Sequence, residues 1–288
     1  MEIIRRSLEL RAALEDVRAS HSIGLVPTMG NLHAGHMALV NTAIARSDVV
    51  VTSIFVNPLQ FGANEDYGEY PRTFQADAEL LNAAGINIIF APTVDSIYPD
   101  GQENKTCVSV PTLSGILCGN NRPGHFDGVA TIVAKLLNIV QPNDAYFGEK
   151  DWQQLTLLAT MTRQLNIPVK IVGVPIVRDS DGLALSSRNQ YLKEAERGIA
   201  PILYQTLIDI RDAIQDGTRN FHSLEQAGSV ALNRAGFRAE YLAVRDSRTL
   251  LPPDTRPAPL RILAAARLGK TRLIDNIGVK VAGSLGSS

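Results

Sequence analysis

Two histidines three residues apart, His33 and His36, form the strongest chemical signal in the sequence, within the stretch VPTMGNLHAGHMALV. A short apolar run ends just before a turn that contains Gly30, and helical periodicity begins near Ala34. The first N–H groups of a helix are unpaired and its dipole is positive there, so helix starts bind phosphate. Because residues three apart share one helix face, both imidazoles can donate to one ligand. A pair of structural histidines is the alternative.

Two later segments carry the cations and hydroxyls that phosphate transfer requires. The stretch FGEKD follows a short predicted strand and opens a helix, which places Lys150 and Asp151 at the helix start. The stretch GLALSSRNQYL holds Ser186, Ser187 and Arg188 in a polar loop, and hydroxyls beside a guanidinium suit a phosphate clamp. A helix-capping charge pair and a solvated linker are the ordinary alternatives for these segments.

Amide side chains follow the second buried run, in the stretch IFVNPLQFG. Asn57 and Gln60 stand just beyond its end, and amides there can bind a carboxylate or a hydroxyl. Simple turn chemistry is the alternative, since Asn-Pro often starts a turn. The segment LGKT at 268–271 ends like a P-loop, but Ala264 stands where that motif requires Gly, so we reject a P-loop.

The elements that must position these residues alternate between strands and helices in the first part of the chain. Apolar runs predict strands at 23–27, 48–58, 86–92, 145–148 and 169–177, and helical periodicity predicts helices at 7–19, 34–46, 72–84, 128–139 and 151–165. This alternation predicts an α/β fold with a Rossmann-like, doubly wound parallel sheet. In such sheets, ligands bind beyond the carboxyl ends of the strands, where the histidine pair stands.

The pattern changes near residue 180, where a polar, turn-rich stretch begins. Two helices at 194–216 and 222–235 are then followed by strand-like runs at 239–246, 261–269 and 271–279. We therefore predict a Rossmann-like domain at 1–177 and a smaller C-terminal α+β domain at 178–282. The remaining residues, 283–288, are predicted to be disordered.

Composition excludes several classes of protein. The 288 residues are 45% hydrophobic and 20% charged with a net charge of −1, so broad electrostatic binding of nucleic acid is not expected. Cys107 and Cys118 form neither a disulfide framework nor a metal-ligand spacing. The N-terminus is too charged for a signal peptide and no apolar run has membrane-spanning length. These features predict a cytoplasmic protein with neither nucleic-acid nor membrane partners.

Taken in order, the motifs resemble the pantothenate synthetase (pantoate–β-alanine ligase) family over essentially the whole chain. The matching stretches are VPTMGNLHAGH, SIFVNPLQF, YPRT, IYPDG, RPGHFDGV, FGEKDWQQL, GVPIVR, DGLALSSRN and RLIDN. This family lies in the His-x-Gly-His nucleotidylyltransferase superfamily, which is related in fold to class I aminoacyl-tRNA synthetases. The resemblance implies an AMP-forming ligase that joins (R)-pantoate to β-alanine through pantoyl adenylate and releases pyrophosphate and AMP.

The resemblance also implies that the domain at 1–177 binds ATP and pantoate, that the domain at 178–282 is a lid, and which residues bind ATP. The implied ATP-binding residues are Met29, Gly30, Asn31, Leu32, His33, Ala34, Gly35, His36, Gly148, Glu149, Lys150, Asp151, Val177, Leu185, Ser186, Ser187 and Arg188. His36 is the implied proton donor, with His33 beside it on phosphate and Lys150 offsetting the α-phosphate charge. Because adenylyl transfer to a carboxylate has little need of a proton, we expect His36 to act mainly by stabilising charge.

Other implied residues concern the second substrate, a metal and a partner chain. Gln60 and Gln154 resemble the pair that binds pantoate, with Asn57 at the same end; Gln60 also reaches β-alanine, and Arg122 and His125 wall the pocket. The family uses Mg²⁺ with ATP, and its acidic cluster after YPRT is reduced here to Asp77, with Glu79 nearby, as the candidate ligand. The resemblance further implies a homodimer.

Two other functions remain open from the sequence. An adenylyltransferase of the same superfamily, acting on a phosphorylated cofactor precursor, would explain the histidine pair equally well. It would not explain a second domain or the stretch FGEKDWQQL. A nucleotide-binding protein without catalytic activity is the third hypothesis, and the complete set of cationic and amide positions disfavours it.

Overall fold

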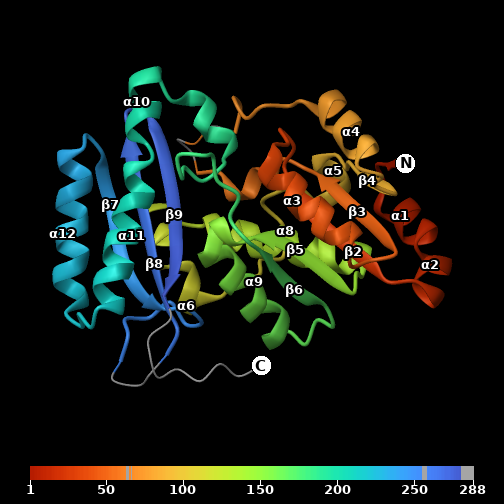
Figure 1. Cartoon of the computed structure of the whole chain (residues 1–288). Helices are drawn as coiled ribbons and strands as arrows, with labels where there is room; N and C mark the ends of the chain where they lie inside the picture. The colour runs from red at the N-terminus through yellow and green to blue at the C-terminus, as the bar shows by residue number, and fades with distance from the viewer. Residues whose placement is uncertain (63–64, 66, 255–257, 280–288) are drawn as a thin grey trace. The chain divides into compact units, whose positions relative to one another are not determined.

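The chain folds into two units of unequal size. Figure 1 shows the computed structural model, which describes residues 1–62, 65, 67–254 and 258–279. Unit 1 comprises Met1–Glu149 and Gln153–Pro175; unit 2 comprises Lys150–Trp152 and the described residues from Ile176 onward. The sequence did not indicate that three residues following the fifth strand belong with the C-terminal unit. The tail predicted to be disordered lies outside the described residues.

Unit 1 is built on a six-stranded sheet. Its strands are β1 (Glu2–Ile4), β2 (Ile23–Thr28), β3 (Val49–Ile54), β4 (Ile88–Phe90), β5 (Asp144–Gly148) and β6 (Lys170–Val174). The order is β1-β4-β3-β2-β5-β6 and every pair is parallel, which confirms the predicted doubly wound sheet. The central strands read as nearly continuous apolar runs because helices cover both of their faces. The edge strand β1 was not predicted.

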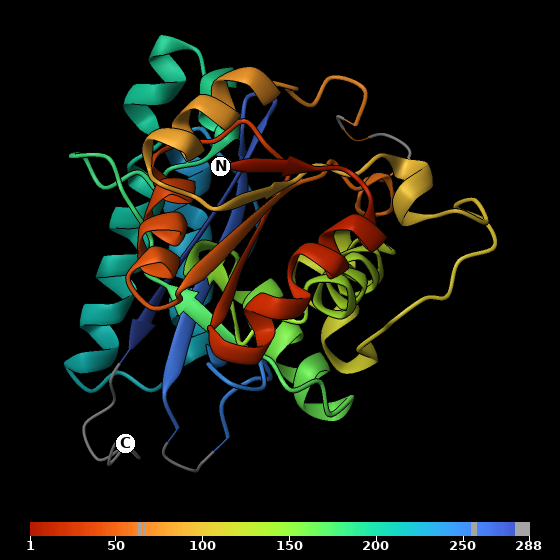
Figure 2. The same cartoon turned by 90° about the vertical axis from the view of Figure 1, so that its right-hand side faces the viewer.

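Helices cover both faces of this sheet. The helices that lie between β1 and β6 in the chain are α1 (Ser7–Ala13), α2 (Glu15–Ser20), α3 (Ala34–Ile44), α4 (Phe74–Ala83), α5 (Val94–Ile97), α6 (Pro111–Ser114), α7 (Cys118–Asn121), α8 (His125–Val140) and α9 (Trp152–Gln164), with 3₁₀ turns η1 (Pro58–Gln60) and η2 (Glu149–Asp151). Figure 2 shows α3 and α4 on one side of the strands and α1, α2 and α8 on the other. The residues predicted as a helix at 7–19 are helical, but they form two helices divided at Leu14, whose φ of −95° and ψ of −3° depart from the values of a regular helix.

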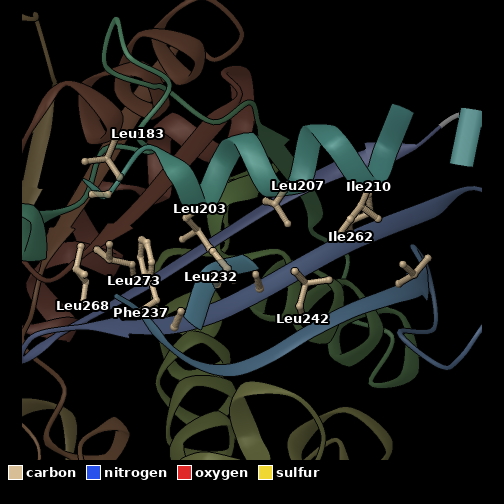
Figure 3. Packing of buried hydrophobic residues seen from close by; sticks show 14 of the residues in the cluster. Leu183, Leu203, Leu207, Ile210, Leu232, Phe237, Leu242, Ile262, Leu268 and Leu273 are labelled. Carbon is tan, nitrogen blue, oxygen red and sulfur yellow. The ribbon is translucent and has the colours of Figure 1, made fainter. Parts of the chain in front are cut away.

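Unit 2 packs helices against a small antiparallel sheet. Its strands are β7 (Arg238–Asp246), β8 (Leu260–Leu268) and β9 (Thr271–Val279), and its helical elements are η3 (Ser187–Tyr191), α10 (Glu194–Ile199), α11 (Ile202–Gln215) and α12 (Phe221–Arg234). Figure 3 shows Leu203, Leu207 and Ile210 of α11 directed at the sheet, with Ile262 near Ile210 and Leu232 near Leu203. The helix predicted at 194–216 is interrupted before Pro201, which has no N–H to donate.

The structure also shows where the LGKT segment and the two cysteines lie, and whether any described helix could span a membrane. The rejected P-loop segment LGKT is the β8–β9 hairpin turn, in which Gly269 has a φ of 57°. Cys107 is exposed, Cys118 is buried, and both are thiols. Among the described residues, no helix combines the length and the apolar character needed to cross a membrane.

Candidate active site

The strand order of unit 1 marks one edge of the sheet as a ligand site. The order reverses at β2, with β3 and β4 on one side of it and β5 and β6 on the other. Ligands of open α/β sheets bind beyond the carboxyl ends of the strands at such a reversal. The carboxyl end of β2 leads through residues 29–33 into α3, and β5 ends at Gly148. The topology therefore places the histidine segment and Gly148 at the same edge.

The two histidines cap the helix on which they stand. His33 is the N-cap residue of α3, and its Nδ1 accepts the backbone N–H of Gly35 at 3.1 Å. In return, Nδ1 of His36 accepts the backbone N–H of His33 at 3.3 Å. The ring centroids lie 4.1 Å apart and both residues are half-buried. This reciprocal arrangement is the imidazole counterpart of a capping box, which satisfies two of the unpaired N–H groups at the helix start.

The cap bonds also decide which nitrogen of each ring carries a proton. A nitrogen that accepts a backbone N–H has no hydrogen of its own, so each neutral ring bears its hydrogen on Nε2. Both histidines therefore present an Nε2–H donor, fixed in direction by a bond on the opposite side of the ring. A pair of oriented donors at a positive helix end suits the charge that develops on a reacting phosphate.

A buried carboxylate holds the loop before the histidines. Asp77, in α4, is 2% exposed, and its oxygens accept the N–H groups of Asn31 at 2.9 Å and Leu32 at 2.8 Å. The hydroxyl of Thr73 donates to the same carboxylate at 3.0 Å. Gly30 has a φ of 82°, and a Cβ there would lie 3.0 Å from Asp77 Oδ2. The carboxylate thus fixes the backbone of the predicted ATP loop through hydrogen bonds.

Replacement of Asp77 by Asn is expected to lower the free energy of unfolding by about 1–3 kcal/mol, because an amide NH₂ would then face a backbone N–H. The same loosening should raise the KM for ATP. Glu79→Gln in the same helix, where Glu79 is exposed, is the matched control and should stay within about 0.5 kcal/mol of the parent. Urea unfolding and initial rates measure both effects. Unchanged stability with an altered Mg²⁺ requirement would instead support Asp77 as a metal ligand.

Two of the three amides predicted at the pantoate pocket, those of Asn57 and Gln60, are hydrogen-bonded to each other in unit 1. Asn57 is 1% exposed; its Oδ1 accepts the Tyr98 hydroxyl at 2.8 Å, and its Nδ2 donates to Gly128 O at 3.1 Å and Gln60 Oε1 at 3.3 Å. Burial raises the pKa of the Tyr98 hydroxyl well above its usual value, so it remains a neutral donor. Nε2 of Gln60 lies 2.8 Å from Met29 Sδ. The buried Asn57, held by Tyr98 and Gly128, therefore orients Gln60.

An arginine–histidine pair holds the other side of Gln60. Arg122 donates to Nε2 of His125 at 2.8 Å, and Nδ1 of His125 lies 2.7 Å from the carbonyl oxygen of Gln60. Because a guanidinium only donates, Nε2 accepts and the Nδ1–H donates to Gln60 O. Arg122 also makes two hydrogen bonds to Glu65, at 2.6 and 2.5 Å. The predicted pocket residues Gln60, Arg122 and His125 are thus in mutual contact.

Glu65 gives this group a defined dependence on pH. Burial alone would raise the pKa of its carboxyl, but the hydrogen bonds and charge of Arg122 bring that pKa below the ordinary value of 4.5. The contact therefore stabilises the fold fully above the ordinary value, and the stabilisation is lost as pH falls through the lowered value.

Glu65→Gln is accordingly expected to cost about 1 kcal/mol of unfolding free energy at neutral pH, and the difference from the parent should shrink below about pH 4. Urea unfolding over a pH series measures it. Glu9→Gln, which removes the exposed 3.8 Å pair with Arg6, should change stability by less than about 0.5 kcal/mol. A Glu65→Gln cost that grows in acid would contradict the ion-pair assignment.

Unit 2 supplies the other predicted phosphate contacts. Lys150 is half-buried, and within the described residues its ammonium makes no hydrogen bond or ion pair. The N–H of Leu185 donates to the carbonyl of Val177 at 2.9 Å, so the predicted adenine contact pairs with the residue just before the SSRN segment (Ser186–Asn189). Ser186 caps η3 by accepting the N–H of Arg188 at 3.3 Å. Val177 and Leu185 lie on a short hairpin, Ser186 and Arg188 lie at the start of η3 that follows it, and Lys150 lies in η2.

Not every predicted site residue makes a hydrogen bond through its side chain. Gln154 is half-buried at the start of α9, and its amide makes no hydrogen bond with the described residues. The sequence predicted no roles for Tyr98, Glu65 or Arg178. A usable signal was present, since IYPDG and GVPIVR, which contain the first and the last of them, lie in stretches that match the family motifs.

The comparisons with known proteins agree over at least 96% of the chain. The family described as pantoate-beta-alanine ligase matches residues 2–278. The pantothenate synthetase of Pseudomonas putida (strain W619) is 56% identical over 280 residues, which are 97% of this chain and 98% of that protein. The pantothenate synthetase of Stutzerimonas stutzeri (strain A1501) is 55% identical over 278 residues, 96% of this chain and 97% of that protein.

Two solved structures resemble the fold closely. The pantothenate synthetase of Thermus thermophilus aligns with a TM-score of 0.90 at 47% identity, covering 97% of this chain and 100% of that chain. The pantoate-beta-alanine ligase of Francisella tularensis, complexed with beta-gamma ATP and beta-alanine, aligns with a TM-score of 0.78 at 36% identity, covering 96% of this chain and 97% of that chain.

Proposed function

Because the chain belongs to the pantoate-β-alanine ligase family, we propose that it joins (R)-pantoate to β-alanine at the expense of ATP, giving pantothenate, AMP and pyrophosphate. The observation that carries this proposal is the reciprocally capped pair of histidines, His33 and His36, at the start of α3, in a chain of which 97% aligns with a pantothenate synthetase. The Francisella relative crystallised with ATP and β-alanine supports the choice of these substrates.

The first step activates a carboxylate that is otherwise a poor electrophile. A pantoate carboxylate oxygen attacks the α-phosphorus of ATP, a new P–O bond forms, and the bond to the bridging oxygen breaks to release pyrophosphate. Negative charge builds on the phosphate oxygens, where His33, His36 and the start of α3 donate. Lys150 contributes a positive charge against the α-phosphate. These groups need not transfer a proton, because no hydrogen moves in this step.

The second step forms the amide. The neutral amine of β-alanine attacks the acyl carbon of pantoyl adenylate, a C–N bond forms, the C–O bond to AMP breaks, and the amine loses one proton to the medium. AMP is a good leaving group, whereas oxide from a free carboxylate is not. Gln60 and Gln154 are proposed to hold pantoate, since amides bond a hydroxyl and a carboxylate without charge repulsion.

Mg²⁺ is proposed to enter as the magnesium complex of ATP, coordinated mainly by phosphate oxygens and water. The site at Asp77 does not fit a metal ion, because the carboxylate is 2% exposed and already accepts two backbone N–H groups and a hydroxyl. Among the described residues, there is no group of three or more His, Cys, Asp or Glu side chains arranged to hold a metal.

A staged mixing experiment tests the proposed reaction. Purified protein with ATP, Mg²⁺ and pantoate should release pyrophosphate up to about one equivalent per site, and AMP should be released only after β-alanine is added. AMP incorporated into a stable product without an amine would point to an adenylyltransferase. ATP binding without turnover of pantoate would point to a protein that only binds nucleotide.

A homodimer is also proposed, on the resemblance to the family, and a cytoplasmic location is proposed on the features of the sequence described above. Sedimentation equilibrium of the purified protein tests the first, with a mass of one chain as the contradicting result. Fractionation of cells that express the chain tests the second.

A further inference from the structure

Two polar residues are buried in the middle of the last strand without a role in the reaction described above. Asp275 and Asn276 are 3% and 2% exposed in β9, within the stretch RLIDN. Successive side chains of a strand point to opposite faces of its sheet, so the two neighbours serve different sides of unit 2. Asp275 lies opposite Ala264 in the register, on the face that carries the apolar core, and Asn276 lies opposite Leu263.

Asp275 holds the hairpin that leads into the SSRN segment. Its two oxygens accept both terminal nitrogens of Arg178, at 2.6 and 2.8 Å, in a bidentate pair. The same guanidinium lies 3.6 Å from the ring centroid of Tyr204 and donates to Gly182 O at 3.0 Å. Arg178 also pairs through its backbone with Ala184. One carboxylate thereby fixes the loop whose next residues are the predicted phosphate clamp.

Asn276 holds the backbone of Lys150. Its Nδ2 donates to the carbonyl oxygen of Lys150 at 2.9 Å, and its Oδ1 accepts Nε of Arg261 at 2.6 Å. Because a carbonyl can only accept and a guanidinium can only donate, these two partners fix the orientation of the amide. Arg261 is 8% exposed and lies 3.5 Å from the ring centroid of Trp152, whose Nε1 donates to Ser247 O at 2.9 Å. Residues 150–152 are therefore attached to the sheet of unit 2.

We propose that Asn276 is a positioning residue for Lys150 in adenylate formation, an inference that rests on the proposed function. The lysine ammonium ends a flexible four-carbon chain, so its reach depends on where its backbone is held. The neighbouring Asp275 places the hairpin before Arg188. Two adjacent residues of one strand thus set the spacing between the two cationic segments that are predicted to bind the triphosphate.

Asn276→Asp is the most direct test, because it keeps the volume and the oxygen that faces Arg261. It replaces the N–H that Lys150 O accepts with a second oxygen, which repels that carbonyl. Misplacement of a catalytic group by about 1 Å costs up to about 10²-fold, so we expect adenylate formation, measured as pyrophosphate release without β-alanine, to fall about 10- to 10²-fold. The KM for ATP should rise, and the KM for pantoate should stay within about twofold.

A double-mutant cycle separates positioning from a general structural effect. Lys150→Ala keeps the backbone carbonyl and removes only the ammonium. If Asn276 acts through that ammonium, Asn276→Asp should cost less than about twofold in the Lys150→Ala background. Full additivity of the two losses would overturn the inference. A Lys150→Ala variant with parental rates would instead refute the role given to Lys150 in the proposed function.

Leu273→Ala is the matched control on the same strand, since Leu273 is 4% exposed in the core of unit 2 and its apolar side chain has no group that could hydrogen-bond to Lys150 or Arg178. It should lower the melting temperature and leave the KM for ATP unchanged. Should Asn276→Asp fail to fold, Arg261→Lys removes the bond to Asn276 Oδ1 and is expected to raise the KM for ATP in the same direction. A folded Arg261→Lys variant with an unchanged KM for ATP would overturn the inference.

Discussion

His36→Asn is expected to slow pantoyl adenylate formation by about 10²- to 10³-fold, as for the loss of one preorganised donor to a developing charge. The oxygen of Asn occupies the place of Nδ1 and can still accept the N–H of His33, so α3 keeps its cap. The donor at the Nε2 position is lost. Pyrophosphate release without β-alanine measures the step, and thermal unfolding should stay near that of the parent.

His36→Gln provides the reciprocal control, because its NH₂ group reaches about as far as Nε2. We expect it to recover part of the rate while losing about 1 kcal/mol of stability with the cap. Equal rates for the two variants would show that the donor at the Nε2 position is not the group that stabilises the transition state. A His36→Asn variant with the parental rate would remove the histidine from the mechanism.

Gly128→Ala is expected to have the largest effect on the substrate pocket. Gly128, in α8, packs so closely on η1 that a Cβ would lie 2.2 Å from Leu59 O and 2.8 Å from Gln60 N. Both are backbone atoms, so the turn that carries Gln60 must move. We expect a loss of about 3 kcal/mol in unfolding free energy, as in overpacked cores, and a KM for pantoate at least about tenfold higher with little change for ATP.

Gly198→Ala is the control for this substitution, because a Cβ on Gly198 in α10 has no atom within 4 Å. It should be neutral or stabilise the chain by about 0.5–1 kcal/mol, since alanine loses less entropy than glycine in a helix. Urea unfolding and pantoate titrations of both variants check these values. Parental pantoate kinetics for Gly128→Ala would show that the position of η1 does not control the pocket.

The sequence predicted the elements whose own residues carry a periodic signal. The apolar runs of β2 and β3 and the periodicity of α3, α8 and α12 were sufficient to predict these elements, because the spacing of apolar residues within each segment shows which face is buried. The edge strand β1 has three residues and pairs with β4, more than eighty positions away, so no local pattern reveals it. The helices α5, α6 and α7 have four residues each, which is too short for a period.

The site residues show the same contrast between local patterns and contacts with residues remote in the sequence. His33 and His36 were found because residue type, spacing and a helix start coincide within a few positions. The roles of the residues that hold the site were not predicted, because their partners are remote. Asp77, which the resemblance offered as a metal ligand, binds the backbone 45 and 46 positions earlier, and Asn276, which was given no role, binds Lys150 across 126 positions. Such pairings arise only when the chain has folded.

The attachment of Lys150–Trp152 to the C-terminal sheet has a consequence for modularity. A gene fragment that begins at Ile176 would encode every strand of unit 2 and yet omit the tryptophan against which Arg261 stacks. A guanidinium that has lost its aromatic cover in a largely apolar setting destabilises its surroundings. Such a fragment is therefore expected to fold less stably on its own than unit 2 does in the whole chain. Chimeras of two relatives joined at 175–176 should fold well only when residues 150–152 come from the same parent as the C-terminal sheet.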